Sequence, residues 1–152
     1  MGWKAAAISL VLSCSAMADA TSTQALGAAG IDPTATRLNY MLNCQGCHAA
    51  DGRGLNDIPT MADFVGSFLS VDGGRAYLVQ VPGSANSPLS DQDLADVLNW
   101  ILLTMSAAQL PHPFIPYSAK EVAGFRQQPL ADATATRARL LEKFTGNSSP
   151  SH

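Results

Sequence analysis

The chain has 152 residues, of which 47% are hydrophobic and 14% are charged, and its formal net charge is −3 at pH 7. This length suits one small domain of roughly 100 residues with extensions. This net charge gives no indication of nucleic-acid binding, so no such partner is expected. A core of this size is thin, and a bulky buried cofactor would add substantially to it.

The first 20 residues have the features of an export signal. Lys4 supplies a positive start, the stretch 5–17 is apolar and uncharged, and cleavage motifs of small residues follow at 16–18 and 18–20. The apolar run is shorter than the about 20 residues that span a bilayer, which favours a secretory signal peptide over a membrane anchor. A lipoprotein signal at Cys14 is less favoured, because Leu12 is bulky for that motif. We therefore expect export to the periplasm and no transmembrane segment in the mature chain.

A helix is predicted directly after a leader of small residues. Residues 21–32 are mostly Ala, Gly, Ser and Thr and predict a flexible leader. The helix is predicted over 33–43, with Asp32 as its N-cap and Pro33 in its first position. Apolar residues fall on one face of this helix, namely Leu38, Met41 and Leu42.

The middle of the chain predicts a loop and two further helices. Glycines spread through 49–74 indicate a loop, and a short helix over 75–81 is expected to end at Pro82-Gly83. A strong helix is predicted from Asp91 to about Thr104, with Ser90 as its cap and acidic residues in its first turn. Its apolar residues recur at helical spacing beside Trp100: Leu94, Val97, Leu98, Ile101 and Leu102.

The C-terminal part predicts helices that follow a proline-rich crossing. Helices are expected over 118–127 and 131–144, and 146–152 is predicted to be a disordered tail. We accordingly predict a main domain over 33–106 and a helical extension over 107–145.

Charge is distributed unevenly between these parts. Residues 21–110 carry three Arg and eight Asp, a net charge of −5, and residues 111–152 carry five basic and three acidic residues, a net charge of +2. The C-terminal segment could therefore lie electrostatically on the acidic core, although two solvated faces are the simpler interpretation.

The run Cys44-Gln45-Gly46-Cys47-His48 is the strongest chemical signal in the chain. C-x-x-C-H is a haem c attachment motif. Two thiols at this spacing reach the two vinyl groups of one porphyrin, and the adjacent histidine then ligates the iron. The motif occurs once, so we expect one covalent haem c held by Cys44 and Cys47, with His48 as axial ligand.

Two other kinds of site use cysteine pairs. Exported cysteines this close would otherwise form a disulfide, and a thioredoxin-like C-x-x-C would follow a strand and open a helix. Here a predicted helix precedes the pair and a glycine loop follows it. A zinc site would need further ligands, and only His112 and His152 remain. Haem attachment is therefore favoured over thiol and zinc chemistry.

The order of elements around the motif resembles that of class I cytochromes c over about residues 33–104. After the motif come the glycine loop Asp51-Gly52-Arg53-Gly54, then Pro59-Thr60-Met61, Ala76-Tyr77-Leu78 and finally Trp100. The resemblance implies an all-α fold, a class I cytochrome c-like helical domain with additional C-terminal helices. It also implies that the Pro59 carbonyl accepts the His48 N–H, and that Trp100 packs on the first helix near Met41.

The sixth iron ligand departs from the family pattern. Class I cytochromes c usually place a Met between the short helix and the last helix, but the loop 82–88 contains neither Met nor His. Met41 and Met61 are expected to be core residues on the attachment side. Met105 is the possible sixth ligand, and His112 is a weaker candidate. An open or water-bound iron, or a ligand such as Asn86, are the remaining alternatives.

The resemblance implies a function in electron transport. The expected protein is a periplasmic one-electron carrier that accepts electrons from a periplasmic dehydrogenase and passes them to another cytochrome or a terminal oxidase. It would be no enzyme, although it could be a subunit of an oxidoreductase complex. The alternative is a five-coordinate haem protein acting as a ligand sensor or small haem enzyme, but the loop 82–88 offers no acid–base residue for peroxide chemistry.

Overall fold

The computed structural model describes residues 23–146. The export signal predicted over 1–20 lies outside the described residues, as does nearly all of the tail predicted over 146–152. Within 23–146 no helix is long and apolar enough to cross a membrane.

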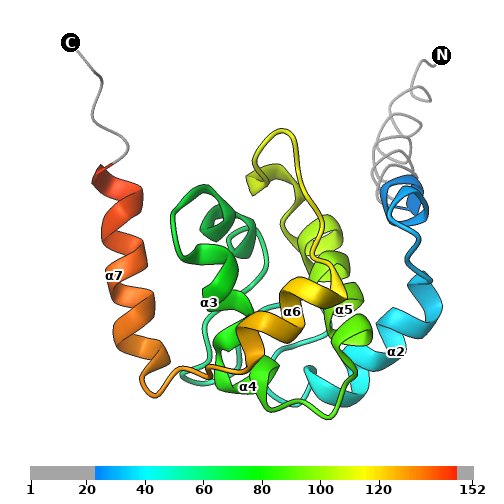
Figure 1. The fold of residues 1–152 in the computed structure, drawn as a ribbon, viewed down its shortest axis with the longest axis horizontal. Helices are drawn as coiled ribbons and strands as arrows, with labels where there is room; N and C mark the ends of the chain where they lie inside the picture. The colour runs from blue at the N-terminus through cyan, green and yellow to red at the C-terminus, as the bar shows by residue number, and fades with distance from the viewer. Residues whose placement is uncertain (1–22, 147–152) are drawn as a thin grey trace, which may run out of the picture.

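Helices form the architecture of the described chain (Figure 1). They are α2 (Pro33–Asn43), the 3-10 helix η1 (Val65–Ser70), α3 (Gly74–Gln80), α4 (Pro82–Ala85), α5 (Asp91–Met105), the 3-10 helix η2 (Ala107–Gln109), α6 (Ala119–Arg126) and α7 (Ala133–Gly146). Within 23–146 the only β pairing outside helices is an isolated bridge between His48 and Gly54, and no strand is formed. The all-α fold class predicted from the sequence is confirmed.

The N-terminal leader is more ordered than its composition predicts. Residues 23–28 are helical, and the side chains of Leu26 and Ile31 are 3% and 4% exposed. The small residues around them predict a flexible leader instead. The two apolar side chains explain the difference, because their burial favours docking of the segment onto the core.

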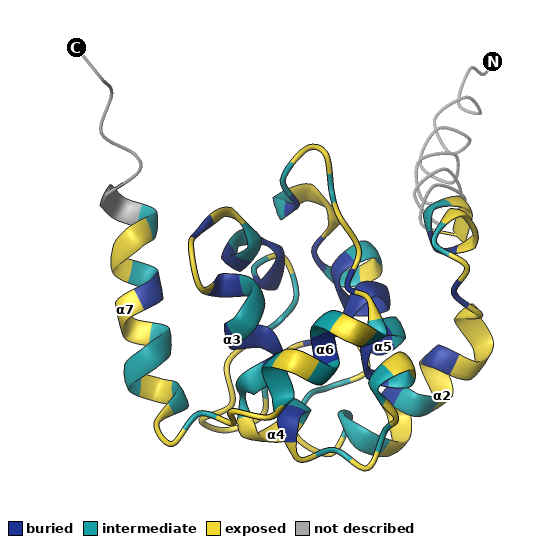
Figure 2. Cartoon of the chain, viewed as in Figure 1, coloured by how far each residue is buried: buried dark blue, intermediate teal, exposed yellow. Residues whose placement is uncertain are grey.

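Helix α2 begins as predicted but buries a different face. The Asp32 carboxylate accepts hydrogen bonds from Thr34 N and Ala35 N at 2.8 and 3.1 Å. The buried side chains are Thr36 and Tyr40, which lie four residues apart. Figure 2 shows that α2 is otherwise largely exposed or half-buried. The apolar residues expected to share a face do so, but they are exposed: Leu38, Met41 and Leu42.

Helix α5 is the centre of the core and packs against both α2 and α6. Ser90 caps it by accepting from Asp93 N, and most residues from Leu94 to Leu102 are buried. The Trp100 ring lies 5.2 Å from the Tyr40 ring, centroid to centroid. Trp100 therefore packs on the first helix as the resemblance implied, against Tyr40 rather than Met41.

Pro82 begins a helix instead of only ending one. Helix α3 stops at Gln80, and α4 starts at Pro82, where the missing N–H of proline costs no hydrogen bond. The loop from Asn86 to Ser90 then leads into α5.

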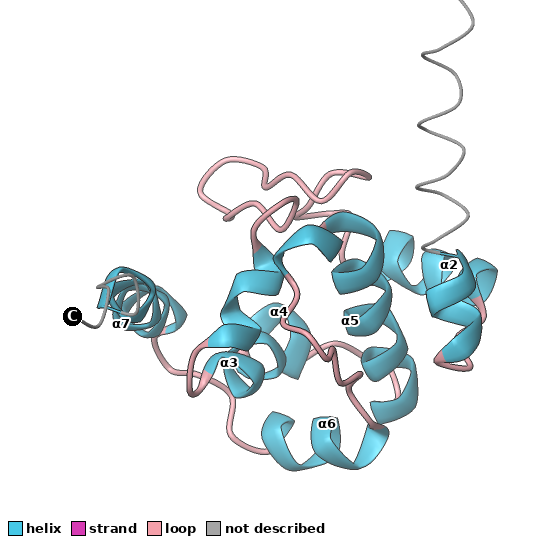
Figure 3. Cartoon of the chain, turned by 90° about the horizontal axis from the view of Figure 1, so that it is seen from above, coloured by secondary structure: helices cyan, strands magenta, loops and turns pink. Residues whose placement is uncertain are grey.

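The C-terminal segment joins the same hydrophobic core. Leu110, Tyr117, Val122 and Leu140 are all buried and belong to the cluster built around α5. Helix α7 packs through Phe144, whose ring lies 5.4 Å from Phe68, centroid to centroid. Seen from above, α7 and α2 lie at opposite sides of the molecule (Figure 3).

Candidate functional site

The cysteine motif forms a tight turn at the end of α2. Cys44 N donates to Tyr40 O at 2.8 Å, and Cys47 N and His48 N both donate to Cys44 O at 3.1 and 3.0 Å. These bonds gather two thiols and one imidazole within a single turn. Both cysteines are free thiols, with Cys44 partly buried and Cys47 exposed.

His48 is partly buried, and one of its ring nitrogens has no partner. Nδ1 is buried and makes no hydrogen bond within the described residues. Burial lowers the pKa of His48 below its usual value of 6.5, so the ring is neutral near pH 7. A neutral imidazole is the form that binds metal ions. The turn therefore presents a histidine in the protonation state that iron ligation requires.

The loop that follows His48 folds back onto the motif. The Tyr40 hydroxyl donates to Ala49 O at 2.6 Å, and Ala49 N donates to Arg53 O at 2.7 Å. Leu55 N donates to Cys47 O at 3.2 Å. Residues 49–55 are thus tied to both α2 and the motif, which restricts the position of the imidazole.

Gly54 allows Pro59 to approach this loop. A Cβ on Gly54 would overlap the carbonyl of Ile58 and lie 2.8 Å from the carbonyl carbon of Pro59. Because Gly54 is also bridged to His48, Pro59 lies close to the histidine. The hydrogen bond from His48 to the Pro59 carbonyl, implied by the resemblance, is not formed in the described structure.

The electrostatics of Cys44 do not suit nucleophilic thiol chemistry. Burial, and then the neighbouring Cys47, raise the pKa of the Cys44 thiol to about 11. Reactive C-x-x-C cysteines instead have a lowered pKa that yields thiolate near neutral pH. The described residues also contain no cluster of three or more His, Cys, Asp or Glu side chains suited to a metal ion. The donor set of two neighbouring thiols and one neutral imidazole fits covalent haem.

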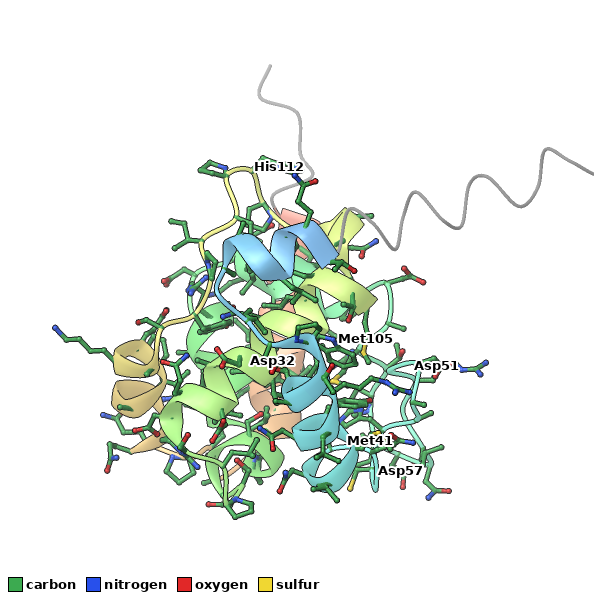
Figure 4. All side chains as sticks on the ribbon, turned by 90° about the vertical axis from the view of Figure 1, so that its right-hand side faces the viewer. Asp32, Met41, Asp51, Asp57, Met105 and His112 are labelled. Carbon is green, nitrogen blue, oxygen red and sulfur yellow. The ribbon has the colours of Figure 1, made fainter. Side chains whose placement is uncertain are left out.

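Met105 lies against the loop that follows the motif. A Cβ on Gly52 would be 2.6 Å from Met105 Sδ, and Asp63 N donates to Met105 O at 2.8 Å. Figure 4 shows Met105 on the same side as Asp51, with His112 at a distant end of the molecule. Met105 is thus near the motif's loop, whereas His112 is not.

The other candidate ligands are dispersed. Met41 is 46% exposed on α2, and Met61 is partly buried against the core. Asn86 is exposed in the loop before α5. The expectation that Met41 is a core residue is therefore wrong, whereas Met61 does pack against the core as expected. Ligation by Asn86 stays an untested alternative.

Sequence reasoning missed two residues that position the motif. Tyr40 supports the loop through its hydroxyl, and its signal was its spacing of four residues before Cys44, which places both on one helical face. Gly54 was noted only as part of a glycine loop. The close approach of Ile58 and Pro59 that makes glycine necessary there depends on how the loop 54–59 turns back on itself, which the sequence did not indicate.

Known proteins resemble this chain. It is 31% identical over 106 residues to two proteins named cytochrome c-552, both from Thermus thermophilus, the second from a named strain of that species. The match covers 57% of this chain and 81% and 72% of the two relatives. No protein-family model matches the chain.

Proposed function

Because this chain belongs to the c-type cytochromes, we propose that it is a one-electron carrier with one haem c attached to Cys44, Cys47 and His48. The observation that carries the proposal is the turn that presents two free thiols beside a neutral imidazole whose Nδ1 is buried and unpaired. Such a turn supplies every protein group that the attachment of one haem requires.

Each residue of the site has a defined role in this proposal. When bound, the haem supplies an iron that alternates between the ferric and ferrous states. Cys44 and Cys47 would provide the sulfur atoms of the two thioethers, which would prevent loss of the cofactor. His48 would ligate the iron through a ring nitrogen. Tyr40 fixes the carbonyl of Ala49 and thereby the chain directly after the histidine.

The sequence and the family support the location and the partners that we propose. The predicted export signal over 1–20 supports a periplasmic carrier. We infer that it accepts electrons from a periplasmic dehydrogenase and passes them to another cytochrome or a terminal oxidase. In this proposal 33–106 is the cytochrome domain and 107–145 is its extension.

Met105 is proposed as the sixth ligand, because its sulfur packs against Gly52 in the loop that follows His48. The second candidate is a five-coordinate haem protein that binds a small exogenous ligand. The loop 82–88, which contains neither Met nor His, favours this alternative.

Haem attachment is tested on the full chain produced together with a haem-attachment system. We expect intact mass and absorption spectra to show one covalent haem, and Cys44→Ser combined with Cys47→Ser to abolish it. Gln45→Ala within the same motif is the matched control and should retain the haem. Absence of covalent haem from the unmodified chain would overturn the proposal.

The sixth ligand is tested with Met105→Ala in the haem-loaded protein. Ligation predicts a low-spin ferric spectrum with a sulfur-to-iron charge-transfer band that the variant loses. Met41→Ala, on an exposed part of α2, is the control. A high-spin ferric spectrum and rapid binding of CO to the reduced unmodified protein would instead establish the five-coordinate alternative.

A further inference from the structure

Arg126, at the end of α6, binds the loop that leads from α4 to α5. Its guanidinium donates to the carbonyls of Ala85, Ser87 and Leu89 at 3.3, 2.7 and 2.9 Å. It also pairs with the Asp91 carboxylate at 2.9 Å. The Arg126 side chain is only 14% exposed. One planar group therefore satisfies three carbonyls of a loop and the first residue of the central helix.

Helix α6 is itself held firmly, so Arg126 acts from a fixed position. Asn99 of α5 donates to Tyr117 O at 3.0 Å and accepts from Tyr117 N at 2.7 Å, and both residues are buried. The Arg75 guanidinium binds both oxygens of Glu121 at 2.7 and 2.8 Å. The first attachment joins the segment directly before α6 to α5, and the second joins α6 itself to α3.

The loop has few interactions of its own beyond its first turn. The Ser87 hydroxyl oxygen is buried and has no hydrogen-bond partner within the described residues. Backbone bonds join Ala85 N to Val81 O and Asn86 N to Pro82 O, and Ser87 N to Ser84 O. Further along the loop, Arg126 holds the carbonyls of Ser87 and Leu89.

We propose that Arg126 is a positioning residue that clamps the loop 85–91 and thereby limits access of small exogenous ligands to the haem. The effect on ligands rests on the proposed function and on the resemblance to class I cytochromes c, which usually place a Met in the loop between the short helix and the last helix. The clamp itself depends only on the contacts of Arg126. The C-terminal segment would then regulate the iron site without contacting it.

The clamp is tested by amide hydrogen exchange on the full chain. In Arg126→Met, which keeps side-chain length and removes the donors, the amides of Ala85, Asn86 and Ser87 should exchange roughly tenfold faster. In Arg126→Lys the same amides should exchange at rates between those of the unmodified chain and Arg126→Met, because one ammonium can pair with Asp91 but cannot reach three carbonyls. Arg139→Met, an exposed arginine on α7, should leave the loop unchanged.

Global loosening is separated from loop opening by the amides of Cys44 and Val65, which are bonded to Tyr40 O and Met61 O outside the segment 85–91. The clamp would be overturned if the control amides exchange faster by the same factor as the loop amides. It would also be overturned if the loop amides exchange no faster than in the unmodified chain. If Arg126→Met does not fold, Arg126→Lys gives the same comparison.

The ligand effect is measured separately, with imidazole added to the ferric haem-loaded protein. We expect imidazole to bind several-fold faster to Arg126→Met than to Arg139→Met. If the two variants bind imidazole at equal rates although the loop of Arg126→Met is loosened, the clamp is retained, but its effect on ligand access to the haem is overturned. A chain that carries no haem would overturn the proposed function, and exchange would still decide whether the clamp exists.

Discussion

Tyr40 links the first helix, the central helix and the motif through one side chain. It is 1% exposed, its ring contacts Trp100, and its hydroxyl donates to Ala49 O at 2.6 Å. Burial, and then the nearby Cys44 and Asp51, raise the pKa of Tyr40 from 10.0 to about 12. The same phenol that positions the loop is therefore also a source of pH-dependent stability.

Tyr40→Phe should lower the free energy of unfolding by about 0.5–1.5 kcal/mol near neutral pH, because the Ala49 carbonyl loses its donor. The unfolded chain releases the phenolic proton near pH 10 and the folded chain near pH 12, so the contribution of Tyr40 is lost as pH rises between these values. Denaturant titrations of both proteins should give a difference that is constant below pH 10 and shrinks above it. A difference that stays constant up to pH 12 would contradict this account.

Replacement by alanine should have a large effect on stability at Gly54 and almost none at Gly46. A Cβ at Gly54 overlaps the Ile58 carbonyl, so Gly54→Ala should cost at least about 2 kcal/mol and reduce the yield of haem-loaded protein. A Cβ at Gly46 would meet no atom within 4 Å beyond its own chain neighbours, so Gly46→Ala should change stability by less than about 0.5 kcal/mol. Thermal denaturation compares the two, and equal effects would show that close packing at Gly54 is unimportant.

At the scale of elements, Asn99 is the main polar connection between the central helix and the C-terminal segment. Its amide pairs with both the N–H and the carbonyl of Tyr117 inside the core. Asn99→Ala leaves these two backbone groups buried and unpaired and should cost about 2–4 kcal/mol. Gln92→Ala, on the exposed side of the same helix, is the control and should be nearly neutral. Similar melting temperatures for both variants would contradict a role for Asn99 in holding the segment.

Helix starts were predictable because their signals are local. Asp32 before Pro33 and Ser90 before Asp91 cap α2 and α5 as the sequence indicated, and the helical spacing from Leu94 to Leu102 placed the core side of α5. The buried side of α2 was not predictable from hydrophobicity. Tyr40 is buried because it reaches both Trp100 and Ala49, while the apolar Leu42 is 73% exposed.

The candidate site also has a part that could be predicted and a part that could not. Cys44, Cys47 and His48 lie within five residues of sequence, so their motif is a local signal, and one turn does bring them together. The contact between Met105 Sδ and Gly52 joins residues more than fifty positions apart, so no local pattern could indicate it. The same is true of Arg126 and the loop that it binds.

At the scale of the whole molecule, the C-terminal segment is built into the core by both charge and apolar contacts. The ion pairs Arg75–Glu121 and Arg126–Asp91 join it to the acidic part of the chain. The Arg75 guanidinium also lies 4.2 Å from the centroid of the Tyr117 ring. Of these two ion pairs, Arg126–Asp91 follows the charge imbalance seen in the sequence, because a base of the extension pairs with an acid of the main domain. Arg75–Glu121 has the opposite polarity, so the imbalance alone does not explain how the segment is attached.

Truncation of the haem-loaded chain at two positions should separate the contributions of this segment. Ending the chain after Ala131 removes α7, with buried Leu140 and the Phe144 ring, and should cost about 2–4 kcal/mol while the fold persists. Ending it after Ser106 also removes Leu110, Tyr117 and Val122, each worth about 1.5–3 kcal/mol when buried.

The longer deletion additionally leaves Asn99 without its partner inside the core. Its total cost approaches the roughly 5–15 kcal/mol that stabilises a whole domain, so we expect no cooperative thermal transition. Calorimetry of the two truncated proteins makes the comparison. A sharp, nearly unchanged transition after removal of 107–152 would show that 33–106 is a self-sufficient domain and that the extension only lies upon it.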